Sequence, residues 1–188
     1  MKICKFSKKA MAVMFILSMF FCFKANAQRD ERKWSFGFGL EGAVPVGDKV
    51  MKDYYSGGGG FTGRVSYHAG PGFITLTTGV LAYIPKDFDE DNVEVGVQVP
   101  LKLGYKFIFA KNLFVQAEAG YSEFGIGYEN EYDEPVTEQY GGFTYAPTIG
   151  ANFGVFEIGL RYESIASLKI DGEKHSLNSA SLRLGFNF

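Results

Sequence analysis

The stretch from Val93 to Phe107 alternates strictly between two kinds of residue. Its odd positions are Val, Leu, Tyr or Phe, and its even positions are charged, amide, Gly or Pro. A period of two is typical of a β-strand with two unlike faces. In a water-soluble sheet the apolar face would contact a core and the polar face would contact solvent. This strand therefore needs a core or a membrane on its apolar side, and a place for the charges of Glu94, Lys102 and Lys106.

Seven further segments of the chain show the same period. They are residues 34–41, 61–68, 74–83, 113–121, 143–153, 156–163 and 179–188. Beyond residue 27 no segment shows a convincing 3.6-residue period, so the sequence predicts an all-β domain of eight antiparallel strands. The segments are close to the ~9–11 residues that a tilted membrane-spanning strand requires.

The connections between these segments alternate in length. The long, polar ones are residues 46–57, 85–92, 122–141 and 164–176, and the short ones are residues 69–72, 108–112 and Gly154. A barrel whose N-terminus lies in the periplasm has long outer loops after odd strands and short inner turns after even strands. All seven connections fit this rule, which favours an up-and-down transmembrane β-barrel. Pro100, inside the fourth segment, predicts a bulge or a local irregularity.

The first 27 residues have the layout of a secretory signal peptide. Four lysines precede an apolar run from Ala10 to Phe23, and Ala25-Asn26-Ala27 supplies a cleavage motif. The run is shorter than the ~20 residues of a membrane-spanning helix. We predict a cleaved signal at residues 1–27 and an outer-membrane β-barrel domain at residues 28–188. An uncleaved anchor and a lipoprotein signal at Cys22 are the alternatives.

The composition after the signal excludes several classes of protein. Both cysteines lie in the signal, so the remaining chain has no disulfide framework and no cysteine nucleophile or metal ligand. The remaining chain carries 14 basic and 21 acidic side chains, because five of the 19 Lys and Arg lie in the signal. An acidic chain without a basic cluster argues against nucleic-acid binding.

Two features resemble a known family. Val99-Pro100-Leu101, within the stretch Val97–Lys106, resembles the strand motif of the small outer-membrane β-barrel domain family that includes PorT-like proteins. The eight-strand layout resembles OmpX and the barrel of OmpA, and the final Phe188 resembles the terminal aromatic of outer-membrane barrels. The resemblance implies an outer-membrane fold but no single activity, since members serve as adhesins, surface proteins or secretion accessories. We expect both termini on the periplasmic side.

Strand parity places ten charged side chains inside the barrel. They are Glu41, Arg64, Glu94, Lys102, Lys106, Glu118, Glu157, Arg161, Glu163 and Arg183. The interior of an eight-stranded barrel is just wide enough for its side chains, and unpaired charges in a low-dielectric interior are costly. Five acids and five bases therefore predict a salt-bridge network that plugs the lumen. A narrow polar conduit is the alternative.

Signals for chemistry are weak. Parity points Ser66 and His68 inward, and His175 lies beside a serine, but neither pair matches a strict catalytic motif. The acidic run Asp87–Asp91 lacks the spacing of an EF-hand. Gly57–Gly60 lacks the Lys and Ser or Thr of a phosphate loop. We therefore expect no cofactor, no metal and no enzyme; a lipid-modifying barrel enzyme is the alternative, and it would require one of the histidines.

The leading hypothesis is a non-enzymatic integral outer-membrane protein that serves in surface binding, adhesion or envelope maintenance. A surface protein or a glycan would bind through its loops, and the predicted contact region is the loop at residues 122–141. Its candidate contact residues are Tyr128, Glu129, Tyr132, Asp133, Glu138 and Tyr140. The alternatives are a narrow channel or carrier for a small solute, and a soluble lipocalin-like carrier whose apolar face lines a cavity.

Overall fold

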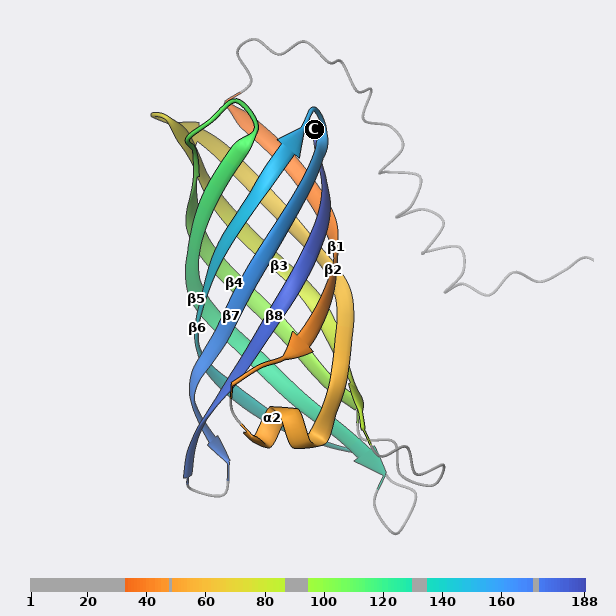
Figure 1. The fold of residues 1–188 in the computed structure, drawn as a ribbon. Helices are drawn as coiled ribbons and strands as arrows, with labels where there is room; N and C mark the ends of the chain where they lie inside the picture. The colour runs from red at the N-terminus through yellow and green to blue at the C-terminus, as the bar shows by residue number, and fades with distance from the viewer. Residues whose placement is uncertain (1–32, 48, 87–94, 130–134, 171–172) are drawn as a thin grey trace, which may run out of the picture. The chain divides into compact units, whose positions relative to one another are not determined.

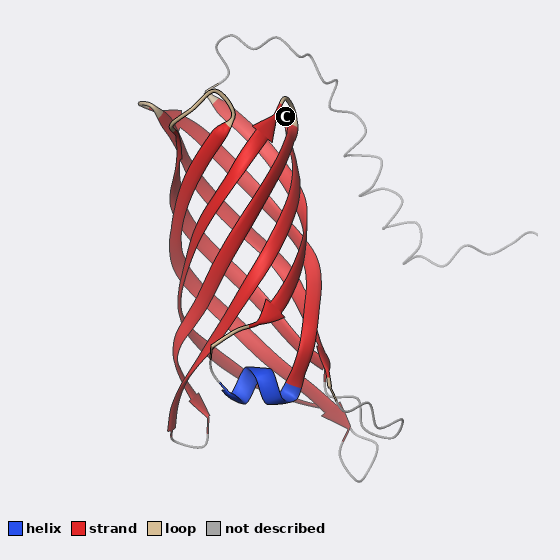
Figure 2. Ribbon diagram, in the orientation of Figure 1, coloured by secondary structure: helices blue, strands red, loops and turns tan. Residues whose placement is uncertain are grey.

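The computed structural model describes residues 33–47, 49–86, 95–129, 135–170 and 173–188 of the chain, and these form a closed barrel with one short helix (Figure 1, Figure 2). The elements are β1 (Trp34–Pro45), α2 (Lys49–Tyr54), β2 (Tyr55–Ala69), β3 (Gly72–Pro85), β4 (Val95–Ile108), β5 (Leu113–Glu129), β6 (Pro135–Phe153), β7 (Phe156–Ile170) and β8 (Glu173–Asn187). Each strand is antiparallel to the next along the chain, and β8 pairs with β1. The predicted eight-stranded up-and-down barrel is confirmed. The predicted signal, residues 1–27, lies outside the described residues.

The two faces of β4 lie in opposite environments. Leu103, on the odd face, is 60% exposed on the outside of the barrel, whereas Lys102 beside it is completely buried in the lumen. The same alternation of exposed and buried residues runs along the whole strand. The barrel is therefore apolar outside and polar inside, which is the reverse of a water-soluble protein and typical of a membrane barrel.

Three short connections lie at one end of the barrel, which we call the short-turn end. They are residues 70–71, 109–112 and 154–155. Gly70 and Gly154 have φ angles of 60° and 68°, a left-handed conformation that glycine adopts without strain. β1 begins and β8 ends at this same end, where the backbones of Phe36 and Phe188 exchange hydrogen bonds of 3.1 and 2.8 Å (Figure 1). The C-terminal residue thus helps to close the barrel.

The opposite end, which we call the loop end, differs from the prediction in extent. β5 reaches Glu129 and β6 begins at Pro135, so most of the loop predicted at residues 122–141 is a β-ladder. β7 and β8 likewise extend to Ile170 and Glu173. The predicted loop boundaries are therefore wrong. Glycines and acids interrupt the apolar alternation here, but backbone pairing of a hairpin that is already in register does not require an apolar outer face.

The helix α2 is a second difference from the prediction. A helix of six residues makes fewer than two turns, so its sequence shows no recognisable 3.6-residue period. β2 begins directly after α2, so Gly57–Gly60 lie within the strand, although the sequence predicted that the strand begins at residue 61. Among the described residues, no helix has the length and the apolar character that crossing a membrane requires.

Pro100 interrupts a ladder without shifting its register. Pairing between β3 and β4 is missing between Thr78↔Leu101 and Leu81↔Gln98, and it resumes in the same register. Pairing between β4 and β5 continues through Pro100↔Ser122. Proline has no N–H to donate, so one side of the strand loses a hydrogen bond. The local irregularity is present, but a bulge is not.

Candidate functional site

The lumen holds five cations and four carboxylates among the described residues. They are Arg64, Lys102, Lys106, Arg161 and Arg183, and Glu41, Glu118, Glu157 and Glu163, and all are buried. Glu94, the tenth residue predicted for the lumen, lies outside the described residues. The barrel wall brings the nine together because each occupies an inward position of its strand. They form three connected groups at different heights.

Glu157 is the centre of the group nearest the short-turn end. Its Oε1 accepts from Arg64 Nη1 at 2.8 Å and from Arg183 Nη1 at 2.6 Å, and its Oε2 accepts from Lys106 Nζ at 2.5 Å. Asn187 Nδ2 adds a bond of 3.2 Å to Oε2. One carboxylate thus compensates three buried cations, so its own charge is the least replaceable in the lumen.

Arg161 is the centre of the middle group, where the balance of charge is reversed. Its Nη1 lies 2.6 Å from Glu41 Oε1, and its Nη2 lies 2.9 Å from Glu118 Oε2. Thr77 donates to Glu118 at 2.5 Å, which fills another acceptor position of that carboxylate. Arg183 Nε lies 3.5 Å from Glu41 Oε1, so Arg183 links this group to the group around Glu157. The cationic excess around Glu157 and the anionic excess around Arg161 are therefore adjacent.

Two glycines make room for the guanidinium of Arg183. A Cβ added at Gly39 would lie 2.8 Å from Arg183 Nη2, and one added at Gly185 would lie 2.4 Å from Arg183 Nη1. Both distances are shorter than a non-bonded contact allows. The side chains of the network therefore occupy the space that inward side chains at these positions would need, which is how the narrow lumen is filled.

A third group leads from the ionic network toward the loop end. Lys102 forms an ion pair with Glu163. Gln98 Nε2 donates to Glu163 Oε1 at 2.5 Å, and Tyr83 donates its hydroxyl to Gln98 Oε1 at 3.0 Å. The space between Tyr83, Gln98 and Phe124 is too small for a water molecule. The polar side chains of this group therefore pack directly against apolar side chains, without a water molecule between them.

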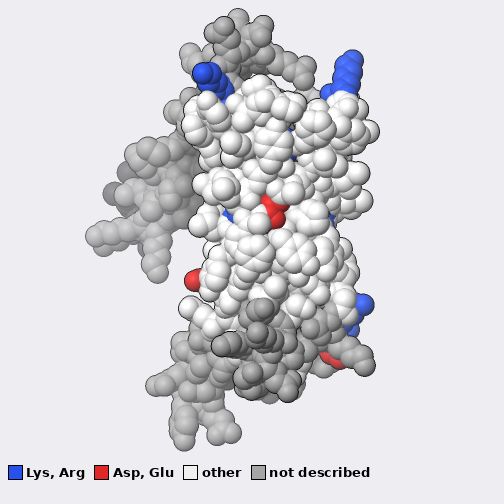
Figure 3. All heavy atoms as spheres, turned by 90° about the vertical axis from the view of Figure 1, so that its left-hand side faces the viewer, with Lys and Arg blue, Asp and Glu red and all other residues white. Residues whose placement is uncertain are grey.

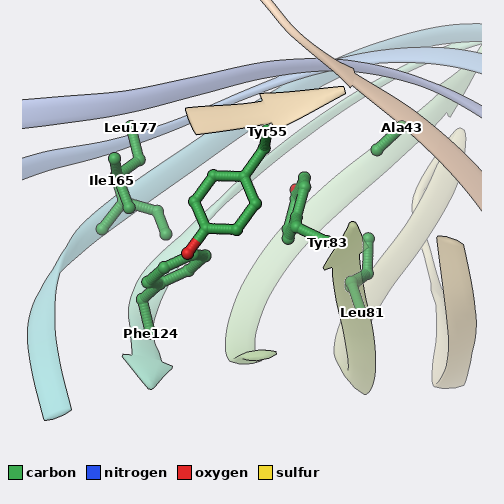
Figure 4. Close-up of a cluster of buried hydrophobic side chains, with 7 residues drawn as sticks. All are labelled: Ala43, Tyr55, Leu81, Tyr83, Phe124, Ile165 and Leu177. Carbon is green, nitrogen blue, oxygen red and sulfur yellow. The ribbon is translucent and has the colours of Figure 1, made fainter. Parts of the chain in front are cut away.

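Between this group and the loop end, an apolar cluster fills the lumen (Figure 4). It consists of Ala43, Tyr55, Leu81, Tyr83, Phe124, Ile165 and Leu177. The ring of Tyr55 meets those of Tyr83 and Phe124 edge-on, with centroids 6.0 and 5.9 Å apart, a favourable geometry for aromatic pairs. Tyr55 directly follows α2 along the chain, so the cluster lies at the loop end, where Figure 1 shows α2.

The alternation of residue types did not predict this cluster. Tyr55, Phe124, Ile165 and Leu177 fell within predicted loops or next to them, where parity was not followed. Leu81 carried the available signal, since it is a large apolar residue at an inward position of a predicted strand. Continuing the parity of each strand past its predicted end would have identified Ala43, Phe124, Ile165 and Leu177. It would have missed Tyr55, because the register of β2 shifts between Tyr55 and Gly57.

The candidate contact residues are not gathered in one loop. Tyr128 and Glu129 lie at the end of β5, and Glu138 lies in β6. Tyr132 and Asp133 lie outside the described residues. Tyr140 lies in β6 and packs against the apolar cluster, so it belongs to the barrel rather than to a loop.

The structure separates the residues considered for catalysis. Ser66 is buried in the lumen, whereas His68 is exposed near the short-turn end and meets the ring of Phe73 at 5.2 Å. His68 keeps the inward parity of Ser66 in the register of β2 with β3, but it lies near the end of the strand, where the side chain is exposed. The side chain of His175 is outside the described part of the structure. In that part, no group of three or more His, Asp or Glu could hold a metal ion; Asp87–Asp91 lie outside it.

The outer wall is almost wholly apolar. Figure 3 shows one side of it, where charged atoms are sparse among the described residues. At the short-turn end, aromatic side chains pack against one another: Trp34 meets Tyr67 at 4.8 Å between ring centroids, and Phe156 meets Phe186 at 4.4 Å. Tyr105 donates its hydroxyl to the carbonyl of Ala69 at 2.9 Å. Amphipathic and aromatic rings at a rim are typical of the interface between hydrocarbon and water.

Solved structures with the same architecture identify the fold. Ail, the attachment invasion locus protein of Yersinia pestis, crystallised with the heparin analogue sucrose octasulfate, superposes with a TM-score of 0.57 at 14% identity, over 82% of this chain and 96% of that one. Neisserial surface protein A superposes with a TM-score of 0.54 at 11% identity, over 83% and 96%. The fold is that of the small outer-membrane β-barrels.

This likeness is one of fold alone. A further structure of Ail, in a phospholipid bilayer nanodisc, superposes with a TM-score of 0.51 at 13% identity, over 82% of this chain and 99% of that one. No protein-family model and no curated protein matches the chain. The comparisons therefore show the fold, and any function must be inferred from the residues of this chain.

Proposed function

We propose that this protein is an integral outer-membrane β-barrel with a closed lumen that acts by presenting its loop end at the cell surface. The observation that carries the proposal is the inverted polarity of the wall, with exposed Leu, Val and Phe outside and paired charges inside. Exposing so large an apolar surface to water is unfavourable, whereas contact with lipid hydrocarbon is favourable. Closure removes the free sheet edges that hydrocarbon does not tolerate. The fold shared with Ail and Neisserial surface protein A supports the same location.

The experiment that tests this location is fractionation of cells expressing the full chain. We expect the protein in the outer-membrane fraction. Its band on an SDS gel should shift when the sample is boiled, because a closed barrel resists SDS until it is heated. Recovery in the soluble periplasmic fraction, without a heat shift, would favour the lipocalin-like carrier instead.

The closed lumen predicts a protein that does not conduct ions. The ionic network fills the lumen from the short-turn end to the middle of the barrel, and the apolar cluster fills the lumen at the loop end. Purified protein inserted in a planar bilayer should give no single-channel steps above the baseline over a range of voltages and salts. A porin inserted under the same conditions serves as the positive control. Regular unitary steps from the wild-type protein would revive the narrow-channel reading.

The charge of the loop end indicates what kind of partner the protein binds. Residues 86–94 contain five acids and one lysine, and residues 122–141 contain six acids and no Lys or Arg. The structure of Ail contains a heparin analogue, but a polyanion of that kind would be repelled by these segments. We infer a cationic partner on a protein surface. Adhesion and envelope maintenance both remain within this proposal.

Neutralising the acids of one segment tests the charge requirement. The variant Glu129→Gln, Glu131→Gln, Asp133→Asn and Glu134→Gln should lose most of its salt-sensitive binding to immobilised polylysine, measured with the protein in nanodiscs, because long-range attraction depends on net charge. Wild-type protein should not be retained on heparin.

A matched control uses the other acidic segment. The variant Asp87→Asn, Asp89→Asn, Glu90→Gln and Asp91→Asn removes the same number of charges. A smaller effect in this control would assign the contact to residues 129–134. Equal retention of all three proteins on polylysine would contradict a charged contact.

A further inference from the structure

The part of β6 at the loop end, residues 135–142, is paired on one side only. Its ladder with β5 continues without a register shift to the first residue of the strand, Pro135. Its ladder with β7 ends at Phe143↔Ala166, although β7 itself continues beyond this pair. In the described part of the chain, residues 135–142 therefore form an edge strand.

A bulge in β7 explains why this edge is open. The register between β7 and β8 shifts between Ile165 and Leu168, at the point where β7 makes its last pair with β6. An extra residue bends a strand and increases its twist, which can end its pairing with a neighbour. Figure 1 shows that the β5–β6 and β7–β8 hairpins end on opposite sides of the loop end. The open edge is therefore a feature of the folded backbone.

The backbone groups on the free side follow from the pattern of the ladder. The backbone N–H of Asn152 donates to the carbonyl of Asn112, next to β5, at 2.7 Å. The even-numbered residues of β6 thus bond toward β5, and the odd-numbered residues point the other way. Because the register with β5 does not shift, the backbone groups of Thr137, Gln139 and Gly141 point to the free side. They repeat every second residue, as pairing with a further strand requires.

The edge lacks the devices that usually prevent strand pairing, which are lysine, proline or a bulge in the edge strand itself. Residues 136–142 contain no lysine and no proline, and no bulge interrupts their pairing with β5. Glu138 lies within the edge, and residues 122–141 contain six acids and no Lys or Arg. A second copy would bring like charges together, which is unfavourable, whereas a basic strand would be attracted.

We propose that residues 135–142 bind an extended, basic segment of a partner protein by taking it up as an additional strand of the sheet. The inference rests on the proposed function and deepens it, because it names how the cationic partner is held. Backbone hydrogen bonds along the edge hold the segment, and the acids of the hairpin attract its Lys and Arg side chains. The edge is longer than the ~5–6 residues of a typical strand, so it offers room for a full ladder.

Two peptides of equal charge separate strand pairing from simple charge attraction. One peptide alternates Thr and Lys over about eight residues, similar in length to the edge. The other has the same sequence with a methyl group on every backbone nitrogen, so it cannot donate backbone hydrogen bonds. Binding of each peptide to the wild-type protein in nanodiscs is measured by fluorescence anisotropy. We expect the unmethylated peptide to bind about tenfold more tightly, because it alone can complete the ladder.

Proline in the edge tests the same point from the side of the protein. Gln139→Pro removes one N–H on the free side and keeps the ladder with β5, as Pro147 does at another odd position of β6. This variant should bind the unmethylated peptide as weakly as the methylated one, whereas Gln139→Val, which keeps the N–H, should bind like the wild type.

Ser176→Pro is the matched control on the other strand that has a one-sided end. β8 pairs with β1 only as far as Ser179, and the backbone carbonyl of Asn178 accepts from Val46 on the β1 side. The N–H of Ser176 therefore also points away from β7. Lys174 makes this end of β8 unsuited to a basic strand, so Ser176→Pro should bind both peptides like the wild type.

Each other outcome overturns the inference. Equal affinity of the wild type for both peptides would leave the charged contact standing and remove strand pairing. Failure of the wild type to bind either peptide, although it shows the heat shift on gels, would remove the cationic partner as well. Equal loss in Gln139→Pro and Ser176→Pro would show that β6 is not the site. Dissociation of a wild-type dimer by Gln139→Pro would assign the edge to a second copy. If Gln139→Pro lacks the heat shift, Thr137→Pro replaces it, and the two peptides on the wild type still decide.

Discussion

Replacing Glu157 by Leu should destabilise the barrel more than any other single exchange in the lumen. The substitution leaves Arg64, Arg183 and Lys106 buried around an apolar side chain, and all three had been bonded to this one carboxylate. Removing one partner of a buried ion pair typically costs about 3–5 kcal/mol. Here Arg64 and Lys106 lose their only carboxylate partner among the described residues, and Arg183 keeps only the longer contact with Glu41 at 3.5 Å. The midpoint of urea unfolding in phospholipid vesicles should fall accordingly, and the heat shift on gels should occur at a lower temperature.

Two companion variants show whether charge is the cause. Glu123→Leu removes an exposed carboxylate on the outer face of β5, and it should leave the midpoint unchanged or raise it. Glu157→Leu combined with Lys106→Leu removes one of the stranded cations, so part of the lost stability should return. A double variant less stable than Glu157→Leu alone would show that packing, rather than charge balance, sets the cost.

The alternation of residue types predicts which side chains enter the lumen, because the side-chain period of a strand is two whatever its partners are. Lys102 and Arg183 could therefore be placed inside from the sequence, and both are buried. The same rule predicted the apolar outer wall. It works wherever a strand has one apolar and one polar face, which here includes most of each strand between the two ends.

The partners within the lumen could not be predicted in the same way. Arg161 in β7 reaches Glu41 in β1 and Glu118 in β5, which are distant along the chain and meet only across the lumen. Which charges share a height depends on the stagger of all eight strands around the closed barrel. Parity does not contain that information, since a shift of one strand by two residues preserves every inward position while changing every neighbour.

The loop end shows a second limit of sequence patterns. β5 and β6 continue through a segment rich in glycine and acids, where the outer face is no longer apolar. Phe124 then contributes to the apolar cluster from a position that the pattern assigned to a loop. Alternation between apolar and polar residues reports a boundary between two environments, and strands that project beyond that boundary lose the signal while keeping their hydrogen bonds.

The outer face allows the membrane location to be tested by a single charge. Leu103→Arg places a guanidinium on the outer wall, about five residues from the short-turn end of β4 and hence near the middle of the hydrocarbon, given a rise of ~3.3 Å per residue and a tilt of ~40°. Arginine at the midplane of a membrane barrel costs about 2–4 kcal/mol. The unfolding midpoint in vesicles should fall by that amount.

Tyr54 at the end of α2 supplies the matched site for this test. Leu103 is 60% exposed and Tyr54 is 63% exposed, so a protein surrounded by water would tolerate arginine equally at both. If hydrocarbon surrounds Leu103 and water surrounds Tyr54, then Tyr54→Arg should leave the midpoint unchanged while Leu103→Arg lowers it. Equal and small effects at the two sites would mean that the apolar face of β4 does not contact lipid, and the proposed location would have to be abandoned.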